Sequence, residues 1–330
     1  MNSPLQEADA LADNLLFPSA LETDAAETPP LSHFEALAEA GLYGLTGPVE
    51  AGGKALGMRD FAAVVERLAS GCLTTTFVWI QHNTPVRELT STPNDSLRRD
   101  WLARLCSGEV RAGIALGGLQ GGSAQIRAEP VEGGWLLTGA APYVTGWGII
   151  DLLLVAALTP DNQVVRALID ARESSSLRPE RLRLLAANAS ATVRLHFDRH
   201  FVLGERITSL EPFKAPPAYD GGGRGNGSLA LGVARRCLRL IGPSPLDSEL
   251  DARRRQLDEA RDEEMATARA AAAELAMRSA AALVVHHGSR SIFLQDHAQR
   301  LYREAAFLLV FGSRPAIRSS LLQRLNATPN

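Results

Sequence analysis

The sequence predicts an α+β protein with an N-terminal helical domain (residues 1–109), a middle β-barrel or sandwich domain (110–214) and a C-terminal helical bundle (215–330). Two observations lead to this fold class. Apolar residues recur at helical spacing towards both ends of the chain, whereas the middle consists of short, alternating or β-branched segments separated by glycine and proline. Closely spaced strands of this kind favour an antiparallel sandwich or barrel over a parallel α/β sheet.

The N-terminal part is predicted to be mainly helical. Apolar stripes indicate helices at 5–16, 32–40, 58–70, 74–89 and 95–106. Ser32 and Glu35 have the spacing of a capping box, and Gly41 and Gly108 are expected to end their helices. We expect Pro85 to kink the fourth helix, because proline cannot donate the helical hydrogen bond.

Strands are expected in the middle of the chain, at 110–116, 124–129, 134–138, 149–158, 164–170 and 191–197. The stretch 133–151 is interpreted as a strand, a turn at Thr138-Gly139, a second short strand and a glycine-punctuated bend. A linker rich in proline and glycine (215–225) ends this region. Helices are then predicted at 226–241, 250–260, 263–287, 296–310 and from about 313 to 325.

Composition excludes several classes of protein. The 330 residues are 45% hydrophobic, which is ample for a large core, and the net charge of -3 leaves no basic footprint for nucleic acid. Three scattered cysteines predict a reducing compartment, without a disulfide framework or a metal site. The start of the chain lacks the pattern of a signal peptide, and the apolar run 152–158 is too short to span a bilayer. We therefore expect a soluble cytoplasmic protein with no membrane partner.

Several motifs occur in an order that matches one known family. Segment 41–45 reads Gly-Leu-Tyr-Gly-Leu, 105–109 reads Leu-Cys-Ser-Gly-Glu, 143–145 reads Tyr-Val-Thr and 300–305 reads Arg-Leu-Tyr-Arg-Glu-Ala. Together they resemble the acyl-CoA dehydrogenase family, whose flavin-facing segment reads Trp-Ile-Thr. The resemblance covers almost the whole chain and implies the three-part fold, an FAD cofactor and a dimer or tetramer.

The resemblance implies cofactor-binding roles for Leu116, Ser123, Tyr143, Thr145, Gly288 and Gly312. In the family the aromatic residue covers one side of the flavin, the threonine bonds near N5 or O4, and the serine reaches the pyrophosphate. The segment around Gly288 would contact the adenosine half of FAD from a neighbouring subunit.

Each of these motifs also has a plain structural interpretation. Tyr143 can be a core residue of an ordinary strand, and the glycine-rich loop 117–123 can be a simple hairpin turn rather than a phosphate cradle. The pair His286 and His287 can interact with the dipole at the end of a helix, with Arg290 as a solvated charge.

The catalytic base of the family is missing from the sequence. The family glutamate that removes the α-proton of the thioester corresponds to Phe311, and an apolar ring cannot accept a proton. The candidate replacements are Glu304, His286, His287 and Asp151. Of these, Glu304 is more readily explained by an ion pair with Arg300 one helical turn away, and Asp151 by a structural role.

The leading hypothesis is an FAD-dependent acyl-CoA dehydrogenase-like oxidoreductase. It would oxidise an acyl-CoA, or another acyl thioester, at Cα–Cβ and pass electrons to an electron-transfer flavoprotein, which implies a role in fatty acid metabolism. Two alternatives remain open. One is a flavin-dependent monooxygenase on the same fold, which needs no α-proton base. The other is a non-catalytic subunit of a hetero-oligomer, which would complete a partner's site.

Overall fold

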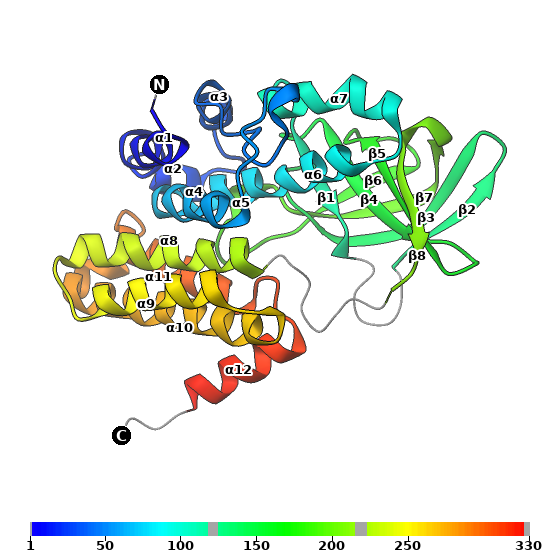
Figure 1. Ribbon diagram of the computed structural model, residues 1–330. Helices are drawn as coiled ribbons and strands as arrows, with labels where there is room; N and C mark the ends of the chain where they lie inside the picture. The colour runs from blue at the N-terminus through cyan, green and yellow to red at the C-terminus, as the bar shows by residue number, and fades with distance from the viewer. Residues whose placement is uncertain (1, 118–124, 215–222, 327–330) are drawn as a thin grey trace.

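The computed structural model describes residues 2–117, 125–214 and 223–326, and it confirms the predicted order of helices, sheet and helices (Figure 1). The N-terminal region consists of α1 (Pro4–Leu11), the π-helical turn η1 (Ala12–Leu16), α2 (Ala20–Ala25), α3 (Leu31–Glu39), the short turn η2 (Val49–Ala51), α4 (Met58–Gly71), α5 (Leu73–Gln81), α6 (Asn83–Ser91) and α7 (Asp95–Ser107).

The ends of these helices follow the sequence signals with two differences. Gly41 and Gly108 take positive φ angles of 66° and 78° at the helix ends, as predicted. The predicted capping box is wrong, because α3 begins at Leu31 with Pro30 as its N-cap, so that Ser32 already lies inside the helix. The kink expected from Pro85 occurs one turn earlier, where His82 separates α5 from α6. Proline has no N–H for the carbonyl four residues back, which explains that position.

The middle region forms one sheet, of eight strands among the described residues. They are β1 (Ala112–Ala115), β2 (Ile126–Val131), β3 (Gly134–Val144), β4 (Leu152–Leu158), β5 (Gln163–Asp170), β6 (Leu177–Arg181), β7 (Val193–Leu203) and β8 (Ile207–Pro212). The order is β6-β7-β3-β2-β4-β5-β8, with β1 beside β4. Most neighbours are antiparallel, but β4 pairs in parallel with β1 and β2. The sequence missed β6 and β8, which lie at the two ends of this order, where polar residues and proline are tolerated.

Strand β3 is continuous, which corrects the predicted turn at Thr138-Gly139. Its register against β7 shifts between Leu137 and Gly139. Gly139 has φ of 129°, and a Cβ there would lie 2.0 Å from the carbonyl oxygen of Gln125. Glycine is therefore required by a bulge within the strand, not by a turn between two strands.

The C-terminal region packs its helices side by side, except for the last one, which extends away from the others (Figure 1). It contains α8 (Gly223–Ile241), α9 (Leu246–Glu259), α10 (Asp262–His287), the short turn η6 (Gly288–Ile292), α11 (His297–Val310) and α12 (Pro315–Leu325). Helix α8 begins three residues before the predicted Asn226, so two glycines of the expected linker lie inside the helix.

The helices that precede the sheet in the sequence and those that follow it pack together and share one hydrophobic core. Leu68 of α4, Leu73 of α5, Leu229 of α8 and Leu275 of α10 are all fully buried in this cluster. Gly232 allows α8 and α4 to approach closely, because a Cβ there would lie 2.5 Å from the carbonyl oxygen of Glu66. The predicted domain limits at 109/110 and 214/215 stay predictions.

Candidate functional site

The end of strand β3 carries the residues that sequence predicts to face a flavin. Strand alternation buries Val144 completely and turns Tyr143 to the surface, where it is 70% exposed. Thr145 is buried, and its hydroxyl lies 3.2 Å from the hydroxyl of Thr192. A large exposed aromatic ring beside a buried hydroxyl is an arrangement that can cover one face of a planar ligand.

Helix α5 lies directly against this strand end. Gly146 has φ of 87°, and a Cβ on it would lie 2.9 Å from Cγ1 of Val78. Glycine therefore permits both the turn after Thr145 and the close approach of α5. The neighbouring residue Phe77 points to a different helix, α11, so α5 links the predicted flavin site with Phe311.

Phe311 is the C-cap of α11 and belongs to an aromatic cluster. Its ring lies edge-on to Phe77, with centroids 4.9 Å apart, and stacks on Phe307 at 5.6 Å. Its N–H donates to the carbonyl of Phe307 at 2.9 Å, and its own carbonyl accepts from Nη2 of Arg269 at 2.7 Å. The position of the expected glutamate is thus an apolar wall with its backbone N–H already engaged.

Gly312 follows directly and is exposed, with φ of 56°. A Cβ on Gly312 would point towards Nδ2 of Asn226 at 3.5 Å and towards Nη1 and Nη2 of Arg269 at 3.8 and 3.9 Å. Neither Asn226 nor Arg269 is predicted from the sequence to be a site residue. The one local signal was Asn226 itself, a polar residue between two glycines at the start of a helix.

Neighbouring contacts fix the orientation of the first turn of α8. Arg224 forms a buried ion pair with Asp258 of α9, with Nε and Oδ1 2.7 Å apart. A Cβ on Gly225 would lie 3.7 Å from Ile80 of α5, and a Cβ on Gly227 would lie 2.7 Å from Leu257 of α9. Asn226 is the partly exposed residue of this turn, and it faces Gly312.

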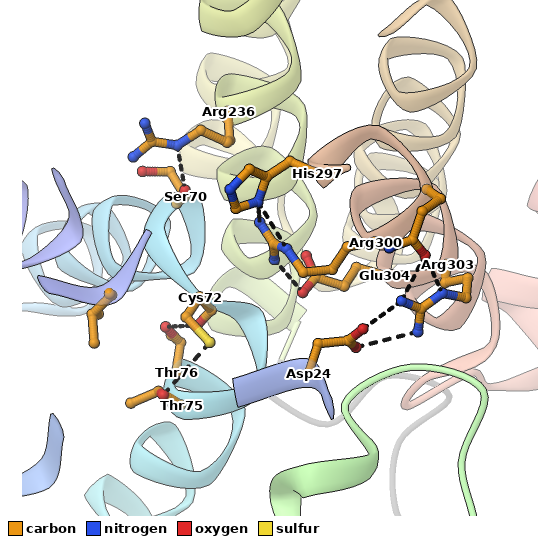
Figure 2. A network of polar contacts seen from close by, with 12 residues as sticks. Asp24, Ser70, Cys72, Thr75, Thr76, Arg236, His297, Arg300, Arg303 and Glu304 are labelled. Carbon is orange, nitrogen blue, oxygen red and sulfur yellow. Dashed lines mark hydrogen bonds and ion pairs between the residues drawn. The ribbon is translucent and has the colours of Figure 1, made fainter. Parts of the chain in front are cut away.

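Glu304 forms the predicted ion pair with Arg300, which is confirmed (Figure 2). Nη1 of Arg300 lies 2.5 Å from Oε1 of Glu304, and the two side chains are 1% and 2% exposed. Burial raises the pKa of Glu304, although the charge of Arg300 opposes this shift. Figure 2 shows the pair between helices, near Cys72, Asp24 and other polar groups, and both side chains of the pair are buried. A carboxylate so enclosed is a structural group rather than an accessible base.

Asp151 has the structural role that sequence suggested as its alternative. Its Oδ2 accepts from the N–H of Arg111 at 2.8 Å, and its own N–H donates to the carbonyl of Arg111 at 2.7 Å. These two bonds tie the start of β1 to the start of β4.

The histidine pair lies at the C-terminal end of α10. Nδ1 of His287 lies 3.0 Å from Oδ1 of Asp296, whereas His286 is exposed. Gly288 ends α10 with φ of 64°. The 14 residues of α11 separate this end of the bundle from Phe311, a length of about 20 Å. Gly288 is therefore not brought together with Gly312 within one chain.

Two other residues, Leu116 and Ser123, are predicted from the sequence to bind the cofactor. Leu116 is half-buried at the end of β1 and packs against the cluster between the sheet and α6–α7. Ser123 lies outside the described residues. Within the described ranges, no group of three histidine, cysteine or acidic side chains could hold a metal ion. No helix of that same part of the chain is long and apolar enough to cross a membrane.

The sequence is similar to those of acyl-CoA dehydrogenases and related enzymes. Residues 4–109 match the family model described as "Acyl-CoA dehydrogenase, N-terminal domain". The chain is 26% identical over 249 residues to the 3-sulfinopropanoyl-CoA desulfinase of Paraburkholderia xenovorans (strain LB400), covering 71% of this chain and 64% of the relative. It is 25% identical over 252 residues to the benzylmalonyl-CoA dehydrogenase of Aromatoleum aromaticum (strain DSM 19018 / LMG 30748 / EbN1), covering 69% and 63%. Each of these matches thus spans less than two thirds of the relative's own length.

The fold is shared with solved structures. Butyryl-CoA dehydrogenase from Megasphaera elsdenii superposes with a TM-score of 0.84 at 17% identity, covering 97% of this chain and 95% of that one. This likeness confirms the predicted fold class. The match of residues 4–109, the two curated relatives and the shared fold thus make the chain similar to the acyl-CoA dehydrogenase family.

Proposed function

We propose that the protein is a flavoenzyme that binds FAD and oxidises an acyl-CoA thioester at Cα–Cβ, with an electron-transfer flavoprotein as electron acceptor and a homo-oligomer as its working form. The observation that carries this proposal is the end of β3, where the exposed Tyr143 is followed by the buried Thr145 and by Gly146, which packs against α5. The named dehydrogenase relative and the shared fold support it.

Bound FAD supplies the acceptor for the hydride that leaves the β-carbon. The chain's own residues orient the reactants. The ring of Tyr143 would cover one face of the cofactor, and the hydroxyl of Thr145 could donate a hydrogen bond to it. Phe77 and Phe311 form an apolar wall that excludes water, which strengthens every polar contact inside the site. The N–H of Gly312 can donate to the thioester carbonyl.

Phe311 favours a second candidate function, a flavin monooxygenase on the same fold. Oxidation of a thioester requires an acceptor for the α-proton, and positioned bases contribute about 10²–10⁴-fold to such steps. Phe77, Phe307 and Arg269, which are ring and hydrogen-bond partners of Phe311 in the described part of the chain, carry no carboxylate. Reduction of O2 by a flavin needs no base at that place.

A spectroscopic experiment separates these functions. The purified protein is reconstituted with FAD and titrated anaerobically with acyl-CoA thioesters. Bleaching of the flavin band supports dehydrogenation, whereas a flavin that ignores thioesters and consumes O2 after chemical reduction supports oxygenation. Failure of the protein to bind FAD alone, with binding restored by a partner protein, would refute both and indicate a non-catalytic subunit.

A matched pair of variants tests the binding site itself. Tyr143→Ala should weaken FAD binding about tenfold, the effect of one lost ring contact of about 1–1.5 kcal/mol. Phe201→Ala is the control, since Phe201 is an aromatic residue of the same sheet that is 46% exposed. Equal affinity of the two variants for FAD would refute the placement of the flavin against Tyr143.

A further inference from the structure

Three buried hydroxyl groups form a row behind the end of β3. Oγ of Ser190 lies 2.8 Å from Oγ1 of Thr192, which in turn lies 3.2 Å from Oγ1 of Thr145. The three residues are 0%, 2% and 7% exposed in that order, so the row leads from the interior towards the surface at Thr145. Ser190 and Thr192 stand just before β7, whereas Thr145 directly follows β3. The row therefore joins two distant segments of the chain.

Burial favours one direction of donation along this row. A hydroxyl group donates one proton and accepts through its lone pairs. If Ser190 donates to Thr192 and Thr192 donates to Thr145, both inner hydroxyls use their protons within the row. The proton of Thr145 is then directed out of the row, at its most exposed end. In the opposite direction the outward proton would belong to Ser190, in the interior, where a buried donor without a partner costs about 1–3 kcal/mol.

Backbone hydrogen bonds hold the two ends of the row together. The N–H of Gly146 donates to the carbonyl oxygen of Ser190 at 2.8 Å, and the N–H of Trp147 donates to that of Ala191 at 3.2 Å. These bonds fix the turn after Thr145 against the segment that carries the other two hydroxyls. The distance between the hydroxyl groups is thus set by the main chain.

The segment before β7 adopts a strained backbone that its contacts enforce. Ala187 and Ala191 have φ of 54° and 52°, a region that costs a non-glycine residue about 1–3 kcal/mol. On its other side the segment is bound by α11, because Nη1 of Arg303 donates to the carbonyl oxygen of Leu185 at 3.0 Å. Arg303 is itself paired with Asp24 of α2 (Figure 2). Such strain persists only where the surrounding structure determines it, and it often accompanies functional sites.

We propose that Thr192 is a positioning residue of the flavin site, which donates to Thr145, fixes the orientation of that side chain and leaves the Thr145 proton for an acceptor on the cofactor. This inference rests on the proposed function, in which the Thr145 hydroxyl faces FAD. Hydrogen bonds in a chain polarise one another, so Thr192 also makes Thr145 a stronger donor. A donor at this place stabilises reduced FAD more than oxidised FAD, because hydrogen bonds to a charged acceptor are roughly twice as strong.

The reduction potential of FAD bound to the protein tests the positioning role without turnover. Thr192→Val keeps the shape of the side chain and removes the hydroxyl. It should weaken the preference for reduced over oxidised FAD at least about threefold, which lowers the two-electron potential by about 15 mV. Thr192→Ser retains a hydroxyl and should restore this preference to within about twofold of the wild type.

A double-mutant cycle shows whether Thr192 acts through Thr145. Thr145→Val removes the donor itself and should lower the potential by about 30 mV, equivalent to a tenfold change in the same preference. The double variant Thr145→Val/Thr192→Val should show the potential of Thr145→Val alone, because the second change then has nothing left to orient. Shifts that add in the double variant would overturn the inference.

Thr208→Val is the matched control for a lost buried hydrogen bond. Thr208 is 1% exposed in β8, and its hydroxyl donates to Oε1 of Glu88 at 2.8 Å. This variant should lower the melting temperature about as much as Thr192→Val does, but it should leave the potential of bound FAD unchanged. A shift in Thr208→Val equal to that in Thr192→Val would overturn the inference, since the effect would then be structural.

Ser190→Ala provides an independent test if Thr192→Val fails to fold. It removes the innermost hydroxyl and should lower the potential by a smaller amount than Thr192→Val. An unchanged potential in Thr192→Val or in Ser190→Ala, with a lowered potential in Thr145→Val, would overturn the positioning role and leave the proposed function standing. An unchanged potential in Thr145→Val, or a protein that takes up no FAD, would overturn the placement of the flavin and this inference with it.

Discussion

The buried ion pair between Arg300 and Glu304 gives a quantitative prediction about stability. The two side chains are 1% and 2% exposed, and Arg300 also lies 3.4 Å from Nδ1 of His297 through its Nε. Replacing Glu304 with leucine would leave a guanidinium in the core without its carboxylate. Removing one partner of such a pair costs about 3–5 kcal/mol, so Glu304→Leu should lower the free energy of unfolding by that amount.

Replacing the other partner, Arg300, should lower the free energy of unfolding by less. Burial raises the pKa of Glu304, so this carboxyl can neutralise itself by binding a proton when Arg300 is replaced by methionine. A guanidinium cannot lose its proton in the same way. The double variant Arg300→Met/Glu304→Leu removes both charges and should return to within about 2 kcal/mol of the wild type, because apolar replacements of buried pairs are often neutral.

Urea unfolding followed by circular dichroism measures these differences, and the four proteins form a double-mutant cycle. Arg261→Met is the control, since Arg261 and Glu264 form an exposed pair whose loss should leave the unfolding midpoint unchanged. The reasoning is refuted if Glu304→Leu is as stable as the wild type. It is refuted equally if the double variant is no more stable than Glu304→Leu.

Three further predictions concern pH, backbone and chemistry. Burial lowers the pKa of His82 to about 4, so the unfolded chain binds a proton at higher pH than the folded protein does. The protein should therefore lose stability as the pH falls from about 6.5 towards 4. Melting temperatures measured from pH 7 to 5 test this, and a pH dependence of the melting temperature that is unchanged in His82→Gln would contradict it. Gly139→Ala should destabilise the sheet by about 2–4 kcal/mol in urea unfolding, more than Gly148→Ala, where φ is 82° but an added Cβ meets no atom within 4 Å. Phe311→Glu should speed anaerobic flavin bleaching by acyl-CoA by about 10²-fold in stopped-flow measurements, and an unchanged rate would show that another group already takes the proton.

The sequence alone predicted the features that depend on residues close together in the chain. The order of helices, sheet and helices follows from local periodicity, and the helix ends at Gly41 and Gly108 follow from the freedom of glycine to adopt positive φ. The pairing of Arg300 with Glu304 follows from their spacing of one helical turn. Sequence also indicated that Phe311 stands where the related enzymes carry a glutamate. Each of these properties is set within a few residues.

Features that depend on distant partners required the tertiary structure. Edge strands β6 and β8 lack a strong apolar pattern, and pairing with β7 and β5 defines them. The break at His82 is held by β1, because Nδ1 of His82 accepts from the N–H of Ala112 at 3.0 Å. Asn226 and Gly312 are far apart in the sequence and meet because α8 and α11 pack in one bundle. The sequence determined the fold and predicted that Phe311 replaces the family glutamate. Long-range packing decided which polar groups face the space beside Phe311, because a pattern of residues carries no information on which distant segment a side chain will meet.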